Sequence, residues 1–234
     1  MTSYPRLAPD ALLLDMDGTL VDSTVVVERT WRRFARRHGL DAEAILATAH
    51  GRRTAETVAR YAPAGVDAAA ETARLVAEEV EDVDGVVPVP GAPELLAALP
   101  DDRWAVVTSA GRELTHRRMT AAGLPLPPLL ISADDVREGK PSPEGYLAAA
   151  AALGVPASET VVFEDAEAGL LAAAAAGATP VVVGAHRGPA AEGRLRVTDL
   201  REVTVTVTAT GAGRGALHLS LSLALALSEP ATRP

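Results

Sequence analysis

The sequence contains no cysteine, and this absence excludes both a disulfide framework and a zinc site built on thiolates. It also lacks any apolar run close to the roughly 20 residues that a membrane-spanning helix needs. The first ten residues have neither the basic stretch nor the long apolar stretch of a secretory signal, so we expect a cytoplasmic protein. The net charge of −9 argues against nucleic-acid and membrane partners.

What the sequence does contain near its start is a short apolar run that ends in two acidic residues. Residues 12–14 predict a buried strand, which Asp15 and Asp17 follow at a spacing of two, and Gly18 then turns the chain. Open α/β sheets bind their ligands at the carboxyl ends of the strands. Two neighbouring carboxylates repel each other, and a hard cation such as Mg²⁺ would compensate them. Taken alone, the pair could also be a strand end with solvated aspartates.

A long helical segment is expected directly after this strand. Apolar residues at helical spacing predict a helix over 24–38, and Gly39 lies where that helix should stop. Further helices are expected over 42–48, 54–61 and 67–80. Because no strand pattern occurs up to residue 83, we expect residues 23–85 to form an all-helical insert after the first strand.

From residue 93 onwards, helices and strands alternate. The expected strands cover 104–108, 129–132, 160–163 and 180–183, and a helix precedes each of them. These strands are apolar throughout, as in a sheet that helices cover on both faces. The alternation predicts an α/β fold with a Rossmann-like parallel sheet. We therefore assign residues 1–22 and 86–234 to a discontinuous core domain.

The carboxyl-terminal segment follows a different pattern. Valines at 203, 205 and 207 alternate with threonines, and after a glycine-rich stretch the leucines from 217 to 227 alternate with small or polar residues. A period of two on both sides of a turn predicts a C-terminal β-hairpin with one apolar face. The hairpin could extend the edge of the core sheet, which we favour, or form a dimer contact. A monomer and a homodimer therefore both remain open.

Three further motifs follow later strands of the expected sheet. They are Val106-Val107-Thr108-Ser109, Gly139-Lys140-Pro141 and Val162-Phe163-Glu164-Asp165. Together with the opening motif, this combination resembles the haloacid dehalogenase-like (HAD) superfamily on its phosphatase side, over about residues 12–183. The resemblance implies a HAD-like core with a helical cap, and a Mg²⁺-dependent phosphomonoester hydrolase that acts through an aspartyl-phosphate.

The resemblance also implies a role for the residues of the first two motifs. Asp15 is expected to be the nucleophile that attacks phosphorus, and Asp17 the general acid and base. Thr108 is expected to bind the phosphate, together with Ser109 and Ala110 at the start of the following helix. For an isolated Thr-Ser pair, an ordinary helix cap would be the alternative.

Lys140 and the last two acids complete the expected site. Lys140 would balance the charge of the phosphate and of Asp15, although a lone loop lysine is more often a solvated charge. By resemblance, Asp165 is a direct Mg²⁺ ligand, together with the Asp15 carboxylate and the Asp17 carbonyl oxygen. Glu164 would either support these ligands from behind or replace a water on the metal.

The loop His50-Gly51-Arg52-Arg53-Thr54 joins two cap helices. It is similar to the loop of small-polyol and sugar phosphatases, including glycerol-3-phosphatases. The resemblance implies that His50, Gly51 and Arg52 contact the substrate, a small phosphorylated metabolite such as glycerol 3-phosphate or a hexose or deoxyhexose phosphate. Arg112 also matches that branch and is a further substrate-binding candidate. An ordinary turn between two helices is the alternative for this loop.

Two rival functions share these motifs. A β-phosphoglucomutase-like enzyme would return the phosphate to a sugar instead of to water. A non-catalytic phosphate-binding protein on the same fold would have no need for Asp15 and Asp17 together. The cap loop favours the phosphatase over the mutase.

Overall fold

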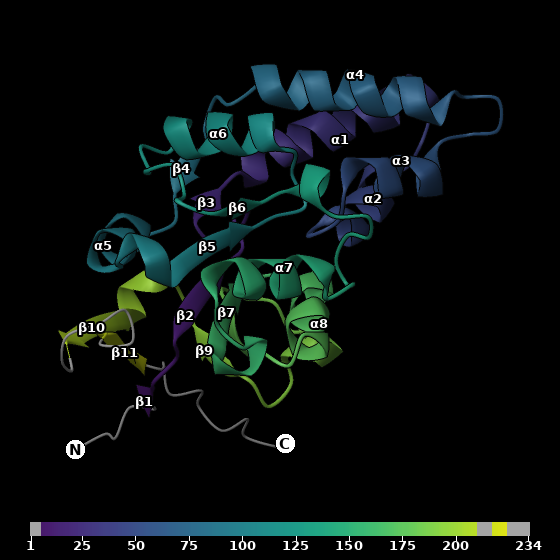
Figure 1. Cartoon of the computed structure of the whole chain (residues 1–234). Coiled ribbons are helices and arrows are strands. Elements are labelled where there is room, and N and C mark those ends of the chain that lie inside the picture. The colour runs from purple at the N-terminus through teal and green to yellow at the C-terminus, as the bar shows by residue number, and fades with distance from the viewer. Residues whose placement is uncertain (1–5, 210–216, 224–234) are drawn as a thin grey trace, which may run out of the picture.

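The computed structural model describes residues 6–209 and 217–223. A six-stranded parallel sheet in the order β6-β5-β2-β7-β8-β9 forms its centre (Figure 1). The strands are β2 (Ala11–Leu14), β5 (Trp104–Val107), β6 (Leu130–Ile131), β7 (Thr160–Glu164), β8 (Thr179–Val183) and β9 (Leu195–Val197). Strand β2 lies between β5 and β7, and Leu12 is in register with Trp104 and Val161. The predicted α/β fold with a parallel sheet is confirmed.

Side chains of the central strand alternate between two apolar layers. Leu13 packs with Tyr146 and Val162 on the face covered by α7 (Glu144–Leu153) and α8 (Glu167–Ala175). Leu12 and Leu14 pack on the other face, which α5 (Ala92–Ala98) and α6 (Arg112–Ala121) cover. Both layers bury the sheet, which explains why its strands are apolar on both faces.

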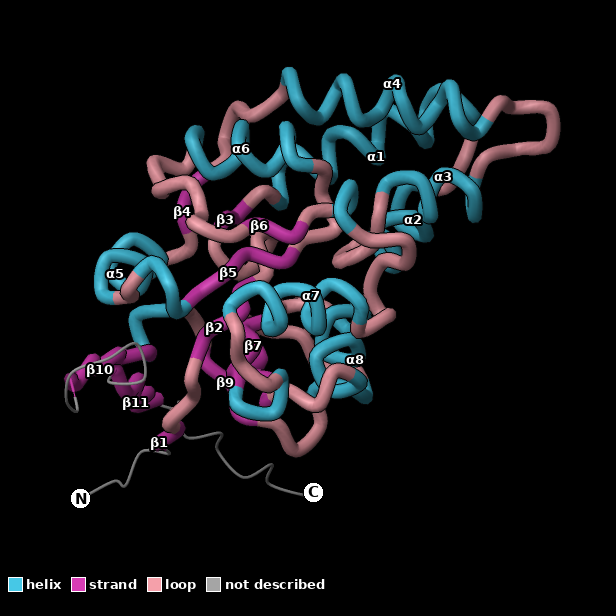
Figure 2. Tube along the Cα trace, in the orientation of Figure 1, coloured by secondary structure: helices cyan, strands magenta, loops and turns pink. Residues whose placement is uncertain are grey.

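Four consecutive helices follow the first core strand (Figure 2). They are α1 (Thr24–His38), α2 (Ala42–Ala49), α3 (Thr54–Tyr61) and α4 (Ala68–Glu81). They share an apolar cluster of their own, in which Phe34, Ile45 and Leu75 are fully buried. A short antiparallel pair closes the base of this helical segment, where β3 (Val21–Asp22) meets β4 (Val87–Pro88). The predicted helices are thus present at the expected positions.

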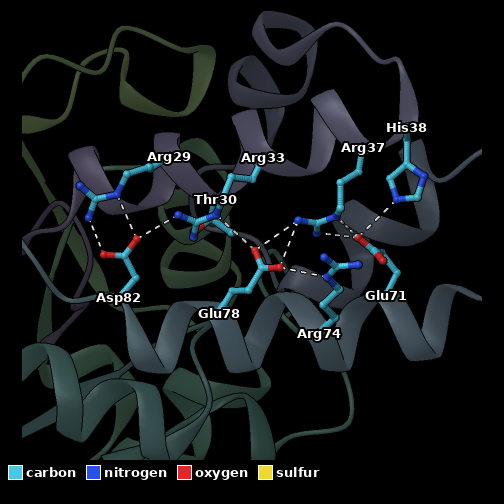
Figure 3. Close-up of polar contacts among 9 residues, drawn as sticks. All are labelled: Arg29, Thr30, Arg33, Arg37, His38, Glu71, Arg74, Glu78 and Asp82. Atoms are coloured by element: carbon cyan, nitrogen blue, oxygen red, sulfur yellow. Dashed lines mark hydrogen bonds and ion pairs between the residues drawn. The ribbon is translucent and has the colours of Figure 1, made fainter.

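Charged side chains join the first and last of these helices (Figure 3). Guanidinium groups of α1 face carboxylates of α4, with nitrogen–oxygen distances of 2.5 Å for Arg29–Asp82, 3.2 Å for Arg33–Glu78 and 2.6 Å for Arg37–Glu71. Arg33 and Arg37 both contact Glu78, so the pairs form a connected network rather than isolated bridges. Networks of this kind stabilise a helix pair more than single exposed ion pairs do.

The C-terminal hairpin is present, but its predicted place in the fold is wrong. β10 (Val203–Ala209) and β11 (Leu217–Leu223) pair antiparallel, and β1 (Arg6–Leu7) joins them in a separate three-stranded sheet. This sheet does not extend the core sheet; Val205 and Val207 pack against the apolar layer beside α5. An alternating strand has one apolar face and suits a sheet covered on one side only. Leucines 225 and 227 lie outside the described residues.

Short 3₁₀ turns occupy several connections: Asp101–Arg103, Ala133–Asp135, Ala157–Glu159, Pro189–Ala191 and Leu200–Glu202.

Within the described part of the chain, no helix combines the length and apolar character needed to cross a bilayer. Strands β1, β3, β4 and β9 had no counterpart among the elements predicted from sequence.

Candidate active site

The carboxyl ends of two neighbouring central strands, β2 and β7, bring the predicted acidic residues together. Asp15 follows β2, and Asp165 follows β7, which is hydrogen-bonded to β2 along its length. One carboxylate oxygen from each of Asp15, Glu164 and Asp165 lies within 4.8 Å of the others. This acidic cluster could hold a metal ion.

Lys140 enters the same cluster from the loop before α7. Its Nζ lies 2.5 Å from Asp15 Oδ1 and 2.6 Å from Glu164 Oε1, and the side chain is buried. Burial would lower the pKa of Lys140, but the carboxylates of Asp15 and Glu164 outweigh it and hold that pKa well above its usual value. Lys140 therefore remains an ammonium ion between the two carboxylates.

Negative charge is in excess at this point. Burial, reinforced by the Glu164 carboxylate, raises the pKa of Asp15 although Lys140 opposes it, and burial with Glu164 raises the pKa of Asp165 as well. One ammonium does not offset the burial and repulsion that raise the pKa values of Asp15 and Asp165, and a divalent cation would lower both. The all-oxygen donor set fits a hard cation such as Mg²⁺.

Glu164 is fully buried, and both of its oxygens are already engaged. Oε1 accepts hydrogen bonds from Lys140 and from Tyr146 Oη at 3.2 Å, and Oε2 accepts one from the Ala166 amide at 2.9 Å. Gly169 on α8 leaves the space for this carboxylate, since a Cβ there would lie 1.6 Å from Oε1. Glu164 thus anchors Lys140, and supports the cluster from behind.

Asp17 occupies the cavity side of the cluster. Its Oδ1 accepts hydrogen bonds from Ser23 Oγ at 2.6 Å and from Arg118 Nη1 at 2.8 Å. Arg118 comes from α6, is buried, and its Nη2 also lies 3.3 Å from Glu79 Oε1 of α4. Thr54 of α3 donates to the other oxygen of Glu79 at 2.9 Å. A chain of polar contacts therefore runs from Asp17 into the helical segment.

Arg118 and Glu79 were not among the residues predicted from sequence. A usable signal exists, because each lies four positions after a buried leucine on the same helix face. Leu75 precedes Glu79 in α4, and Leu114 precedes Arg118 in α6. A charged residue in the buried stripe of a helix marks a polar site or a buried ion pair.

The residues of the second motif lie beside the acids. Thr108 follows β5, and its Oγ1 accepts a hydrogen bond from the Ala110 amide at 3.1 Å. That amide is therefore engaged within the loop. Ser109 Oγ donates to the Gly51 carbonyl at 2.8 Å and so joins the end of β5 to the loop between α2 and α3.

The loop of residues 50–53 rests directly on the core. A Cβ at Gly51 would lie 2.7 Å from the Cβ of Ala166, so the backbone approaches the start of α8 closely. The guanidinium of Arg53 donates to the carbonyls of Val136 at 2.8 Å and Arg137 at 3.0 Å. These contacts hold the helical segment against the core at the site.

A cavity of about 90 Å³, here called the central cavity, lies where the helical segment meets the strand ends. The catalytic candidates Asp15, Asp17 and Thr108 line it, as do the substrate-binding candidates Ser109, Ala110, His50, Gly51 and Arg52. Its other walls include Val27, Trp31, Thr54, Glu79, Leu114, Arg118 and Asp165. The volume is far below the roughly 300–1,000 Å³ of pockets for drug-sized ligands, so the cavity suits a small substrate.

Arg112 is not brought into this site. Its guanidinium pairs with Asp135 at 2.7 Å, and it lines a separate surface groove on α6. The arrangement therefore does not support the predicted contact between Arg112 and substrate. Arg112 carries an exposed ion pair at the start of its helix.

Comparison with known proteins agrees with this geometry. The profile of the haloacid dehalogenase-like hydrolases matches residues 9–177. Hexitol phosphatase A of Escherichia coli is 44% identical over 196 residues, which cover 80% of this chain and 88% of that protein. Glycerol-1-phosphate phosphohydrolase 2 of Saccharomyces cerevisiae is 39% identical and covers 76% of each chain.

A solved structure also matches the fold of this chain. A hydrolase from Pseudomonas syringae superimposes with a TM-score of 0.71 at 27% identity, over 82% of this chain and 96% of that one. Sequence, fold and the cluster of strand-end acids with its buried lysine therefore agree. The chain belongs to the haloacid dehalogenase-like hydrolase family.

Proposed function

We propose that this protein is a Mg²⁺-dependent phosphatase that hydrolyses phosphomonoesters of small polyols or sugars. The observation that carries the proposal is the contact of Lys140 with Asp15 at the floor of a small cavity that Asp17 also lines. The relatives named as phosphatases of hexitol and glycerol phosphates support the substrate class.

In the first step, a carboxylate oxygen of Asp15 attacks phosphorus while the bond from phosphorus to the substrate oxygen breaks. Asp17 donates its proton to that oxygen, and an alcohol leaves. In the second step, Asp17 takes a proton from water, whose oxygen attacks phosphorus and displaces Asp15. Inorganic phosphate departs, and the Asp15 carboxylate is restored.

Thr108 and Lys140 hold the phosphoryl group and its charge during both steps. The Asp15 and Asp165 carboxylates and the Asp17 carbonyl oxygen would hold Mg²⁺, and Glu164 would keep Lys140 in place. When bound, the ion supplies positive charge that orients and neutralises the phosphoryl oxygens.

Residues 23–85 act in this proposal as a cap domain on a core of residues 1–22 and 86–234. The loop from His50 to Arg52 faces the site, and closure of the cap would exclude bulk water during the first step. The small volume of the central cavity favours leaving groups with a few carbons.

Release of inorganic phosphate from glycerol 3-phosphate, sorbitol 6-phosphate and hexose phosphates tests the proposal, with Mg²⁺ and with EDTA. We expect metal-dependent release that Asp15→Asn abolishes and that Asp101→Asn, an exposed aspartate, leaves unchanged. Release that persists in EDTA would contradict the metal requirement. Interconversion of hexose 1- and 6-phosphates without phosphate release would show a mutase instead.

A further inference from the structure

The position of the general acid fixes where the leaving group must lie. In the proposed function, on which this inference rests, Asp17 protonates the oxygen that leaves phosphorus. The carbon atoms attached to that oxygen must then occupy the part of the central cavity next to Asp17, on the side away from Asp15. The residues that surround this part of the cavity will contact the alcohol portion of the substrate.

Two buried charged side chains lie at that position. Arg118 contacts Asp17 at 2.8 Å, and Glu79 lies 3.3 Å from Arg118. Only 3% of Arg118 and 5% of Glu79 is exposed, yet both line the central cavity. One comes from the core helix α6 and the other from α4 of the helical segment, so the pair spans the two parts of the molecule.

The hydrogen-bonding capacity of this pair is not filled. Arg118 Nε is buried and has no hydrogen-bond partner among the residues that the structure describes. Each Glu79 oxygen accepts one hydrogen bond, from Arg118 or from Thr54, and a carboxylate oxygen can accept a second. Buried polar atoms are nearly always paired, so unfilled donor and acceptor sites on two residues that line a cavity indicate a polar ligand.

The lining of the central cavity also includes apolar side chains, among them Val27, Trp31 and Leu114. A polyol or sugar presents hydroxyl groups beside C–H groups, and a lining with both charged and apolar side chains complements both. A purely apolar alcohol would leave Arg118 Nε and the second acceptor sites of the Glu79 oxygens unpaired, at a cost in binding.

We propose that Glu79 and Arg118 are the specificity-determining residues that select a polyhydroxylated leaving group. The Glu79 carboxylate accepts a hydrogen bond from a substrate hydroxyl near the phosphate ester, and Arg118 Nε donates one to a hydroxyl oxygen. Thr54 holds the Glu79 carboxylate in the orientation that this contact needs.

The test compares two substrates that differ in hydroxyl groups. The value of kcat/KM is measured for propyl phosphate and for whichever of glycerol 3-phosphate and sorbitol 6-phosphate the wild type hydrolyses faster. We expect the ratio of polyol to propyl phosphate to be high in the wild type and to fall roughly 10- to 100-fold in Glu79→Gln, as for loss of a charged hydrogen bond.

Glu81→Gln is the matched control, because it makes the same chemical change on the same helix at an exposed position. It should leave the ratio as in the wild type. If Glu79→Gln fails to fold, judged by its Tm, Arg118→Lys tests the same ratio, since lysine keeps the charge but has no equivalent of Nε.

An equal loss on both substrates in Glu79→Gln would assign the pair a structural role and overturn the inference alone. A ratio of kcat/KM for the polyol phosphate to kcat/KM for propyl phosphate near one in the wild type would also overturn the inference alone. Absence of phosphate release from every substrate in the wild type would overturn the proposed function itself, and the inference with it.

Discussion

The carboxylate of Asp165 occupies the space in which a side chain at Gly18 would stand. A Cβ at position 18 would lie 2.0 Å from Asp165 Oδ2, and the glycine has a φ of +86°, which other residues rarely adopt. The absence of a side chain at Gly18 therefore lets the Asp165 carboxylate approach the turn that follows Asp15 and Asp17. Gly18 thus leaves open the position that the Asp165 carboxylate occupies.

Replacement of this glycine should weaken metal-dependent activity. In Gly18→Ala, the new methyl group displaces the Asp165 carboxylate, and we expect the Mg²⁺ concentration for half-maximal activity to rise about 10- to 100-fold. Gly39→Ala is the control, because Gly39 has a φ of +65° but open space where the Cβ would lie. If both variants need the same Mg²⁺ concentration as the wild type, the close approach has no role in placing the acid.

Loss of the buried ammonium should impair both activity and stability. In Lys140→Met, Asp15 and Glu164 face each other without a cation, so we expect kcat to fall at least about 100-fold and Tm to drop. The double variant Lys140→Met/Glu164→Gln should recover part of the Tm but none of the kcat. A Tm no higher in the double variant than in Lys140→Met would show that Glu164 was not the source of the instability.

The contact of Arg53 with the loop before Lys140 gives a third prediction. Arg53→Lys keeps the charge but cannot donate to the Val136 and Arg137 carbonyls together, since lysine lacks the planar fork. We expect faster amide hydrogen exchange across residues 136–142 and a kcat about 10-fold lower. Arg60→Lys, on an exposed part of α3, should change neither quantity. Unchanged exchange in Arg53→Lys would show that the loop is held by its other contacts.

The ion pairs between α1 and α4 should make stability depend on pH. Burial alone would raise the pKa of Glu78, but hydrogen bonds and charges from Arg74, Arg37 and Arg33 outweigh it and hold that pKa below its usual 4.5. A depressed pKa stabilises the fold above the unfolded-state value, and this contribution is lost as pH falls through the folded-state value. The same sign applies to Glu71 and Asp82, whose pKa values are also lowered.

The Tm of Glu78→Gln should therefore lie below that of the wild type at pH 7, and the difference should shrink below about pH 4.5. High salt should also reduce the difference, because these pairs are partly exposed. A difference that stays constant from pH 7 to pH 3 would mean that the Glu78 charge contributes nothing to stability.

The residues at the strand ends were predictable from sequence, because the carboxyl ends of parallel strands all lie at the same edge of the sheet. Asp15, Thr108 and Asp165 each follow an apolar run that the chain pattern identifies as a strand. They converge because β5 and β7 are the two neighbours of β2 in the sheet. The loop from His50 to Arg52 was placed at the site by resemblance, and it lines the central cavity.

Contacts between helices were not predictable in the same way. Glu79 and Arg118 meet only because α4 packs along α6, and nothing in either helix specifies the other. The position of the hairpin was missed for a similar reason. Its alternation shows that one face is buried, but not which surface buries it.

The network between α1 and α4 in Figure 3 also bears on the order in which the chain can fold. Its partners are close along the sequence, with Arg37 only 34 residues from Glu71. Strand β2 instead pairs with β7, which is synthesised much later, so this pairing cannot form until β7 is available. Near-range contacts form sooner than distant ones, so on a ribosome the four helices can assemble while the first core strand is still unpaired.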